Sequence, residues 1–265
     1  LLGIGTIMVF SSSQYFAQYY PYYDSFYFLK RQLVNVAVGI CGMIFFMKVK
    51  YTYWKKFSLP ALIFCVVLLL LIFLSGLGVE GGGAARWLNI GGFQFQPSEV
   101  AKVCMILYMA TYLTRNQFNI QKSFRSFAIA VAIFGTVAML VVVQPGLSTG
   151  IVIAATCYVM MICIGCKPAH LLSLMGLGVA AVIAAIILEP FRMRRIVAFM
   201  NPWADAQDSG FQTVQSLLAI GSGGFSGAGL GAGGAKWYYL PAQHTDFIFS
   251  VLAEELGFIG AALVV

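Results

Sequence analysis

Charged side chains are scarce in this sequence: they make up 9% of 265 residues, against 60% hydrophobic residues. A soluble domain needs a wetted surface that so few charges cannot provide, so the composition predicts a polytopic membrane protein. The six cysteines lie within or at the ends of apolar runs and lack paired CxxC spacing, so neither a disulfide framework nor a metal site is indicated. No signal-peptide features precede the first apolar run, and both ends lie inside such runs, so we expect a fragment cut at both ends.

Apolar windows long enough to cross a hydrocarbon core of ~30 Å occur repeatedly along the chain. They predict an all-α, polytopic membrane protein with eight transmembrane helices in one domain over 1–265. The windows are 1–18, 32–47, 58–77, 98–113, 126–143, 149–166, 170–188 and 247–265.

Basic residues are distributed asymmetrically over the loops. The segments KVKYTYWKKF, TRNQFNIQKSFR and CKPAH follow the second, fourth and sixth windows and together hold eight basic and no acidic residues. The positive-inside rule places this side in the cytoplasm. The net charge of +7 therefore reflects membrane topology and does not indicate nucleic-acid binding. The loops 78–97, 144–148 and 189–245 are predicted to face the outside, and the last is long enough to be functional.

The long loop 189–245 combines two kinds of sequence. Its first part, which begins EPFRMRRIVAFMNPW, predicts an amphipathic helical segment, whereas GSGGFSGAGLGAGG lets the backbone bend or pack closely. A flexible linker is the alternative for the glycine run. A nucleotide-binding P-loop is not indicated, because there is no GK[ST] and no strand before the run.

Four separated blocks of this sequence resemble one known family. NPWADAQDSGFQTVQSLLAIGSGGFSGAGLG (201–231) and YLPAQHTDFIFSVLAEELGFIG (239–260) are similar to the SEDS family of cell-wall polymerases, the rod-shape, division and sporulation proteins. GGGAARWLNIGGFQFQPSEVAK (81–102) resembles the family's first large outer loop and fourth span, and QPGLSTG (144–150) its turn between the fifth and sixth spans. The residues before HTDFIF and the GSGG glycines are closer to the division and sporulation branch.

The resemblance implies a ten-span enzyme of the bacterial cytoplasmic membrane, whose last two spans would follow Val265. Such an enzyme polymerises lipid II, a lipid-linked disaccharide-peptide, into glycan strands on the outer face. It works with a class B penicillin-binding transpeptidase. No cofactor is implied with certainty; a divalent cation stays open, and a metal site cannot be assigned.

Asp246 lies where the outer loop enters the last window, so its carboxylate can face a wet cavity at the membrane surface. A positioned carboxylate is a suitable general base for a sugar hydroxyl that attacks an anomeric carbon bearing a lipid diphosphate. The resemblance matches Asp246 to the family's essential aspartate and thus implies a catalytic role. The alternative is structural: Thr245 caps the following helix and Asp246 favours its positive end.

His244 and Thr245 are candidates for substrate contact beside Asp246, although an outer histidine is also often a solvated hydrogen-bonding residue. Glu254 and Glu255 lie about two and a half turns further along the same predicted helix and must point inward.

The two glutamates need partners inside the protein, and the alternatives are a buried cation, with Lys102 as a candidate, and polar backbone. Glu99 lies three residues before Lys102, at a spacing that lets the two pair on one helix. The resemblance marks Glu99 and Lys102 as functional residues that shape a cavity.

A lipid diphosphate requires cations, and arginine binds phosphate oxygens at two points. The outer loops offer several candidates, and a headgroup-binding collar is the alternative for the cluster in 192–195. Polar or aromatic residues of the same loop are candidates for the sugar site. The candidate substrate-binding residues are Arg86, Trp87, Arg192, Arg194, Arg195, Asn201, Trp203, Gln212 and Lys236, while Gln215 and Ser216 are equally compatible with facing water.

Two departures from the family pattern are present. Gly146 replaces an aspartate that is common on the 144–150 turn, which lowers the expectation of a cation site there, and Tyr238 stands where some division-branch members carry glutamate. Two other functions are carried as alternatives: a lipid II flippase or transporter that uses mid-membrane charges, and a non-catalytic scaffold for a transpeptidase.

Overall fold

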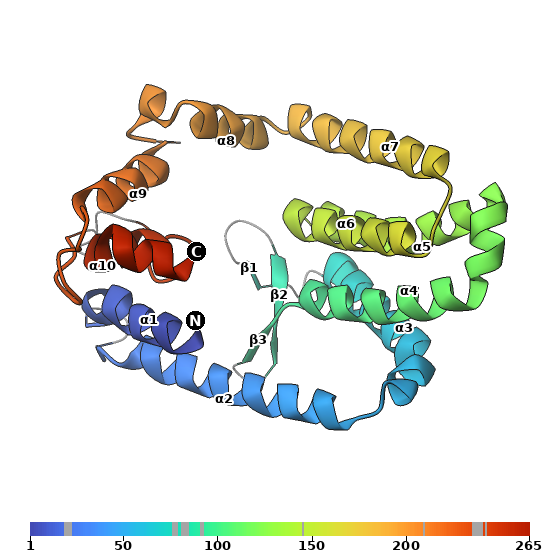
Figure 1. Ribbon diagram of the computed structural model, residues 1–265, viewed down its shortest axis with the longest axis horizontal. Helices are drawn as coiled ribbons and strands as arrows, with labels where there is room; N and C mark the ends of the chain where they lie inside the picture. The colour runs from blue at the N-terminus through green and yellow to red at the C-terminus, as the bar shows by residue number, and fades with distance from the viewer. Residues whose placement is uncertain are drawn as a thin grey trace. The chain divides into compact units, whose positions relative to one another are not determined.

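The computed structural model spans residues 1–265 and describes 1–18, 23–75, 79–80, 85–90, 93–144, 146–208, 210–234, 241 and 243–265. The elements, in chain order, are α1 (Leu2–Ala17), α2 (Tyr27–Lys48), α3 (Tyr51–Ser75), β1 (Val79–Glu80), β2 (Ala85–Ile90), β3 (Phe93–Phe95), α4 (Pro97–Lys122), α5 (Phe124–Val143), α6 (Leu147–Cys163), α7 (Pro168–Ile187), α8 (Pro190–Met200), η1 (Pro202–Asp205), α9 (Phe211–Ser222) and α10 (Ile248–Val264) (Figure 1). Contacts group these elements into two compact units, Leu1–Met47 with Val182–Val265, and Lys48–Ala181.

Each predicted apolar window coincides with a helix, from α1 to α7 and then α10. Four of the helices in the described part of the chain, α2, α3, α5 and α7, are long and apolar enough to cross a membrane. α1, α6 and α10 have 16 or 17 residues, and α4 carries charged residues along its length. The helical architecture is therefore confirmed, whereas the number of eight spans stays a prediction.

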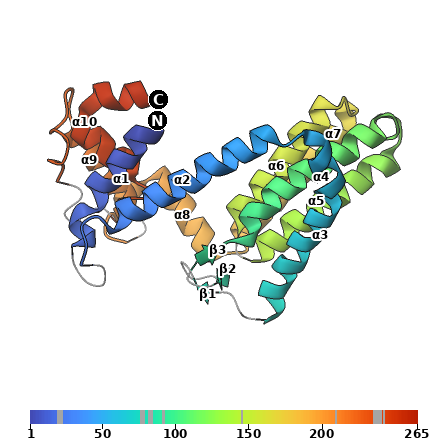
Figure 2. The same ribbon diagram turned by 90° about the horizontal axis from the view of Figure 1, so that it is seen from below.

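Four helices pack together in the unit Lys48–Ala181. α3 packs along α4, and α4, α5 and α6 pack against one another (Figure 2). Leu69, Met105 and Met161 are fully buried between them, and Phe134 is 4% exposed. A polar contact also joins two of these helices: Gln144, directly after α5, donates to the Leu69 carbonyl of α3 at 2.7 Å.

The basic loops meet at one end of this four-helix unit. Gln121, at the end of α4, donates to the Ile164 carbonyl after α6 at 2.6 Å, and Lys167 lies 3.5 Å from the Lys122 carbonyl. The turns α4–α5 and α6–α7 are thus adjacent, as the charge distribution predicts for loops on one side of a membrane.

Short strands occupy part of the loop 78–97, which the sequence analysis did not predict. β2 pairs antiparallel with β1 and β3, and Leu88 lies opposite Phe95. These strands are an addition to the expected all-α fold. Directly after them α4 begins at Pro97, where the missing proline N–H costs no helical hydrogen bond.

In the other unit, α10 packs against α1 and α9. Met8 of α1 and Val251 and Leu252 of α10 form a small buried cluster, which Phe247 and Ile248 partly cover. This packing fixes the start of α10, where the candidate catalytic residue lies.

Candidate functional site

Asp246 is exposed and lies two residues before the first residue of α10, Ile248. Phe247 is the N-cap of this helix, and its side chain makes no capping hydrogen bond. Within the described part of the chain the Asp246 carboxylate makes no hydrogen bond or ion pair. Thr245 is therefore not the N-cap of α10, whereas the other part of the structural alternative, in which Asp246 favours the positive end of the helix, stays a prediction.

α10 is interrupted at Gly257, whose φ of +66° and ψ of −169° are not helical. The prediction that Asp246 and the two glutamates share one continuous helix is wrong, because Asp246 precedes the first turn. Glu254 and Glu255 nevertheless lie on α10 and are buried, at 6% and 0% exposure.

The two buried glutamates contact hydroxyl and backbone groups of the same unit. Ser11 of α1 lies 2.8 and 2.7 Å from the two oxygens of Glu255. Glu254 Oε1 accepts the Gly234 backbone N–H at 2.7 Å and lies 3.4 Å from the Ser222 hydroxyl. The alternative of polar backbone partners is thus confirmed for Glu254.

The glycine run 221–234 packs against the interruption in α10. The N–H groups of Ala228 and Gly229 donate to the carbonyls of Glu254 and Glu255 at 3.0 and 2.9 Å. In return, the Phe258 N–H donates to the Gly224 carbonyl at 2.9 Å. Because α10 is interrupted at Gly257, these backbone groups lack hydrogen-bond partners within the helix. The glycine run provides the hydrogen-bond partners instead. The flexible-linker interpretation is therefore wrong, and close backbone packing is confirmed.

A polar groove of about 330 Å³ lies between α8 and the start of α9. The guanidinium carbon of Arg195 lies 4.6 Å from the centroid of the Phe191 ring. Among the residues that the structure describes, neither Arg194 nor Asp208 forms an ion pair. The groove contains guanidinium groups, which bind anions. It also contains amides and a carboxylate, which accept hydrogen bonds from hydroxyl and amide donors. Its lining residues are Phe191, Arg194, Arg195, Gln207, Asp208, Phe211, Gln212 and Pro241.

The other predicted ligands of the long loop have different surroundings. Arg192 donates to the Ala185 carbonyl of α7 at 2.8 Å and so satisfies the end of that helix. Asn201 and Trp203 are exposed. Ser216 contacts Ser250 at 2.6 Å between their hydroxyl oxygens, which joins α9 to α10.

His244 is half-buried against aromatic rings, and burial lowers the pKa of its imidazole below the usual range. Sequence reasoning did not single out the neighbouring Gln243, which is 4% exposed and whose Oε1 has no partner among the described residues. It also missed Ser11, although a run of three serines, 11–13, inside an apolar window is a visible signal. All three of these serines are buried.

In the four-helix unit, Glu99 and Lys102 form the predicted pair at 2.8 Å. Their side chains are 52% and 28% exposed, so the pair is not buried within the protein. Lys102 lines a small cavity of about 60 Å³ between α4 and α6. Lys102 and Glu254 belong to different units, so the pairing considered for them stays a prediction.

Several predicted residues lie wholly or partly outside the described residues. Arg86 and Trp87 are in β2, but their side chains are not described, and Lys236 and Tyr238 are not described at all. At the 144–150 turn, a Cβ on Gly146 would lie 2.8 Å from the Val141 carbonyl oxygen, so an aspartate at this position would require the turn to shift. No group of three or more metal-binding side chains occurs among the described residues.

Apolar helices, together with a polar groove and a carboxylate at the entrance to α10, define a polytopic membrane protein with a polar site on its long loop. The sequence matches the family described as cell cycle protein, FtsW/RodA/SpoVE, over residues 1–265. The chain belongs to this family, which is the SEDS family that its motifs resemble.

Individual relatives agree with this assignment. Stage V sporulation protein E of Bacillus subtilis is 41% identical over 264 residues, which cover 100% of this chain and 72% of that protein. A probable peptidoglycan glycosyltransferase, FtsW of Geobacter sulfurreducens, is 37% identical over 265 residues, covering 100% of this chain and 70% of that protein.

Solved structures show the same fold. A chain from a peptidoglycan synthase complex that coordinates polymerization and crosslinking superposes with a TM-score of 0.70 at 26% identity, covering 98% of this chain and 72% of that chain. The rod shape determining protein RodA of Thermus thermophilus gives a TM-score of 0.61 at 22% identity, covering 99% of this chain and 67% of that chain. The second likeness concerns the fold alone.

Proposed function

We propose that this protein is a peptidoglycan glycosyltransferase that polymerises lipid II on the outer face of the bacterial cytoplasmic membrane, with Asp246 as general base. The observation that carries the proposal is the exposed Asp246 carboxylate, which neither caps α10 nor pairs with another described residue. It is therefore available to a substrate hydroxyl. Relatives named peptidoglycan glycosyltransferase support the reaction class.

The groove between α8 and α9 is the proposed site of the substrate diphosphate and its adjoining sugar. Arg194 and Arg195 supply guanidinium groups, and Gln212 supplies an amide beside them. Pro241 of the same groove lies five residues before Asp246 in the chain, so the groove and the proposed base belong to one stretch of loop. The volume of about 330 Å³ is at the lower end of the range for small-molecule sites, which suits a diphosphate with one adjoining sugar.

A class B penicillin-binding transpeptidase is the proposed partner. Its support is the resemblance of the sequence motifs and the likeness to a chain from a peptidoglycan synthase complex. Asn201, Trp203 and Thr245 remain proposed substrate contacts, because their side chains are exposed on the same loop. A divalent cation remains an open part of the proposal, to be tested by adding a chelator to the polymerisation assay.

The transporter alternative places the essential charges on Glu254, Glu255 and Lys102. The two glutamates are buried and bind groups that hold α1 and the glycine run on α10, which favours a structural role. A scaffold would require neither these charges nor Asp246. The exposed position of Asp246 therefore favours the polymerase.

The decisive experiment compares wild type with Asp246→Asn in the full-length protein, purified with its transpeptidase and incubated with lipid II. Asparagine keeps the size of the side chain but cannot accept the proton, so we expect glycan formation to fall about 10²–10⁴-fold while the complex still assembles. Glu255→Gln should lower thermal stability, because the Glu255 carboxylate binds Ser11, and it should reduce turnover less than Asp246→Asn does. Near wild-type polymerisation by Asp246→Asn would reject Asp246 as the base. A larger loss of activity in Glu255→Gln than in Asp246→Asn would favour the transporter.

A further inference from the structure

A histidine on the segment that leads to Asp246 packs against two phenylalanine rings that also contact each other. The His244 ring is 4.5 Å from the Phe28 ring and 5.9 Å from the Phe16 ring, and the two phenyl rings are 6.1 Å apart, between centroids. Phe16 lies in the last turn of α1, and Phe28 lies in the first turn of α2. Aromatic pairs attract at centroid separations of about 4.5–7 Å. We call Phe16, Phe28 and His244 the aromatic clamp.

Burial lowers the pKa of the His244 imidazole and so favours its uncharged form. An uncharged imidazole packs against phenyl rings as an aromatic side chain does. The contacts with the Phe16 and Phe28 rings therefore account for the location of His244.

Asp246 depends on its neighbours for its position. Its carboxylate is exposed and is bound by no side chain in the described part of the chain. On one side Phe247 packs against the buried cluster around Met8. On the other side Gln243 is 4% exposed and His244 lies in the clamp. Asp246 follows His244 by two residues, a stretch of chain that spans at most ~7 Å, so the clamp keeps Asp246 within this distance of His244.

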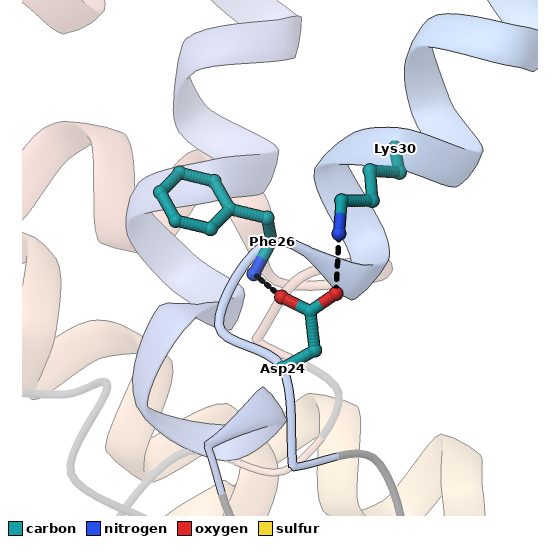
Figure 3. Close-up of polar contacts among 3 residues, drawn as sticks. All are labelled: Asp24, Phe26 and Lys30. Carbon is teal, nitrogen blue, oxygen red and sulfur yellow. Dashed lines mark hydrogen bonds and ion pairs between the residues drawn. The ribbon is translucent and has the colours of Figure 1, made fainter.

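The start of α2, which supplies Phe28, is itself held in place. Asp24 accepts the Phe26 backbone N–H at 2.9 Å and the Lys30 ammonium at 2.6 Å (Figure 3). These contacts hold the pKa of Asp24 below its usual range, the Lys30 hydrogen bond being the larger cause. The turn before α2 therefore places Phe28 at a defined position beside α1.

We propose that His244 is a positioning residue, which the aromatic clamp holds so that the Asp246 carboxylate stands where a substrate hydroxyl reaches it. The proposal rests on the proposed function, in which Asp246 is the general base. In this role the imidazole exchanges no proton with the substrate, and the required property of His244 is a flat aromatic ring.

The kinetic test uses full-length protein with its transpeptidase and lipid II, and it measures kcat and KM separately. His244→Phe keeps a ring in the clamp and should stay within about threefold of wild type. His244→Ala and Phe28→Leu remove a ring and should lower kcat about ten- to a hundredfold with little change in KM, since misplacement by about 1 Å is sufficient for such a loss.

Phe26→Leu is the matched control. It removes the stacked pair Phe10–Phe26, whose rings are 5.3 Å apart and which joins α1 to the turn before α2 without contacting His244. We expect wild-type kinetics. A loss equal to that of Phe28→Leu would show that any loosening of these segments is harmful, and it would overturn the clamp. Equal impairment of His244→Phe and His244→Ala would also overturn it, because the imidazole itself would then be required.

A second measurement tests the clamp without catalysis. A spin label on Asp246→Cys, in protein whose native cysteines are replaced, reports the mobility of this segment. The label should become more mobile with His244→Ala and stay unchanged with His244→Phe. Unchanged mobility with His244→Ala would overturn the positioning role even if the wild-type protein formed glycan. Absence of glycan from the wild type would instead contradict the proposed function, and the label would still decide the clamp.

Discussion

The arginines of α8 lie within four residues of one another, yet the structure gives them different roles. Arg192 donates to the Ala185 carbonyl at the end of α7, whereas Arg194 lines the polar groove. Arg195 also lines the groove and stacks on Phe191. A collar of equivalent headgroup-binding arginines would not require these differences. The groove therefore favours Arg194 and Arg195 as diphosphate ligands and leaves Arg192 a structural role.

Arg194→Ala and Arg192→Ala are a matched pair that tests this division. Arg194→Ala removes a charge from the groove and should raise the KM for lipid II about tenfold, or ~1.4 kcal/mol of binding, with little change in thermal stability. Arg192→Ala should leave KM unchanged and lower the free energy of unfolding by ~1 kcal/mol, since it removes one hydrogen bond to a helix end. Steady-state kinetics and thermal unfolding check both. Equal changes in KM would show that the arginines act as one nonselective collar.

Contacts between close residues could be predicted from the sequence, whereas distant ones could not. The Glu99–Lys102 pair follows from a spacing of three residues on one helix. Ser11 and Glu255 are separated by 244 residues, and their contact depends on how α1 packs against α10. The sequence indicated that Glu255 needed a partner inside the protein but could not identify Ser11, because the hydrophobic pattern does not fix which helices are neighbours.

The glycine run and α10 form one structural element, although they are separate in sequence. Gly227 has a φ of +83°, and a Cβ there would collide with the Glu255 carbonyl oxygen. Gly257 has a φ of +66°, and it faces the backbone of the same run. The run ends at Gly234, whose N–H donates to the Glu254 carboxylate. The segment that carries Asp246 follows later in the chain. Close backbone approach therefore explains the need for glycine.

Gly227→Ala should destabilise this element, and Gly221→Ala is its control. Alanine at 227 meets both an unfavourable φ and the Glu255 backbone, so we expect a loss of ~1–3 kcal/mol in the free energy of unfolding and a lower yield of folded protein. Gly221 lies in α9 with nothing within 4 Å of an added Cβ, so alanine there should be neutral or slightly stabilising. Thermal unfolding in detergent measures both. Equal stability of the two variants would show that the packing of the glycine run against α10 does not contribute to stability.

Helices were easier to predict than the other elements of this chain. A membrane-length apolar window specifies a helix locally, and each of the windows coincides with one. The strands between 79 and 95 pair through backbone groups, and their short, glycine-flanked sequence has no clear period of two. The interruption of α10 could not be predicted either, because it depends on the glycine run that occupies the freed backbone groups.

At the scale of the whole molecule, sidedness follows from the placement of charge. The turns α4–α5 and α6–α7 contact one another through Gln121 and Lys167, and both carry basic residues. α3 packs along α4 and begins in the basic segment after Lys50. Two of the three segments that the positive-inside rule assigns to the cytoplasm therefore lie side by side. The proposed chemistry requires the long loop 189–245 on the opposite side.

A cysteine-accessibility map of intact cells tests this orientation. Single cysteines are introduced into full-length protein whose native cysteines are replaced, since Cys41 and Cys163 are exposed and would react themselves. Positions in 48–57 and 114–125 should be protected from an impermeant reagent, whereas positions in 200–235 should be labelled. Permeabilised cells provide the control, because all of these positions should then react. Labelling of 48–57 in intact cells would reverse the orientation, and Asp246 could then not act on a substrate presented at the outer face.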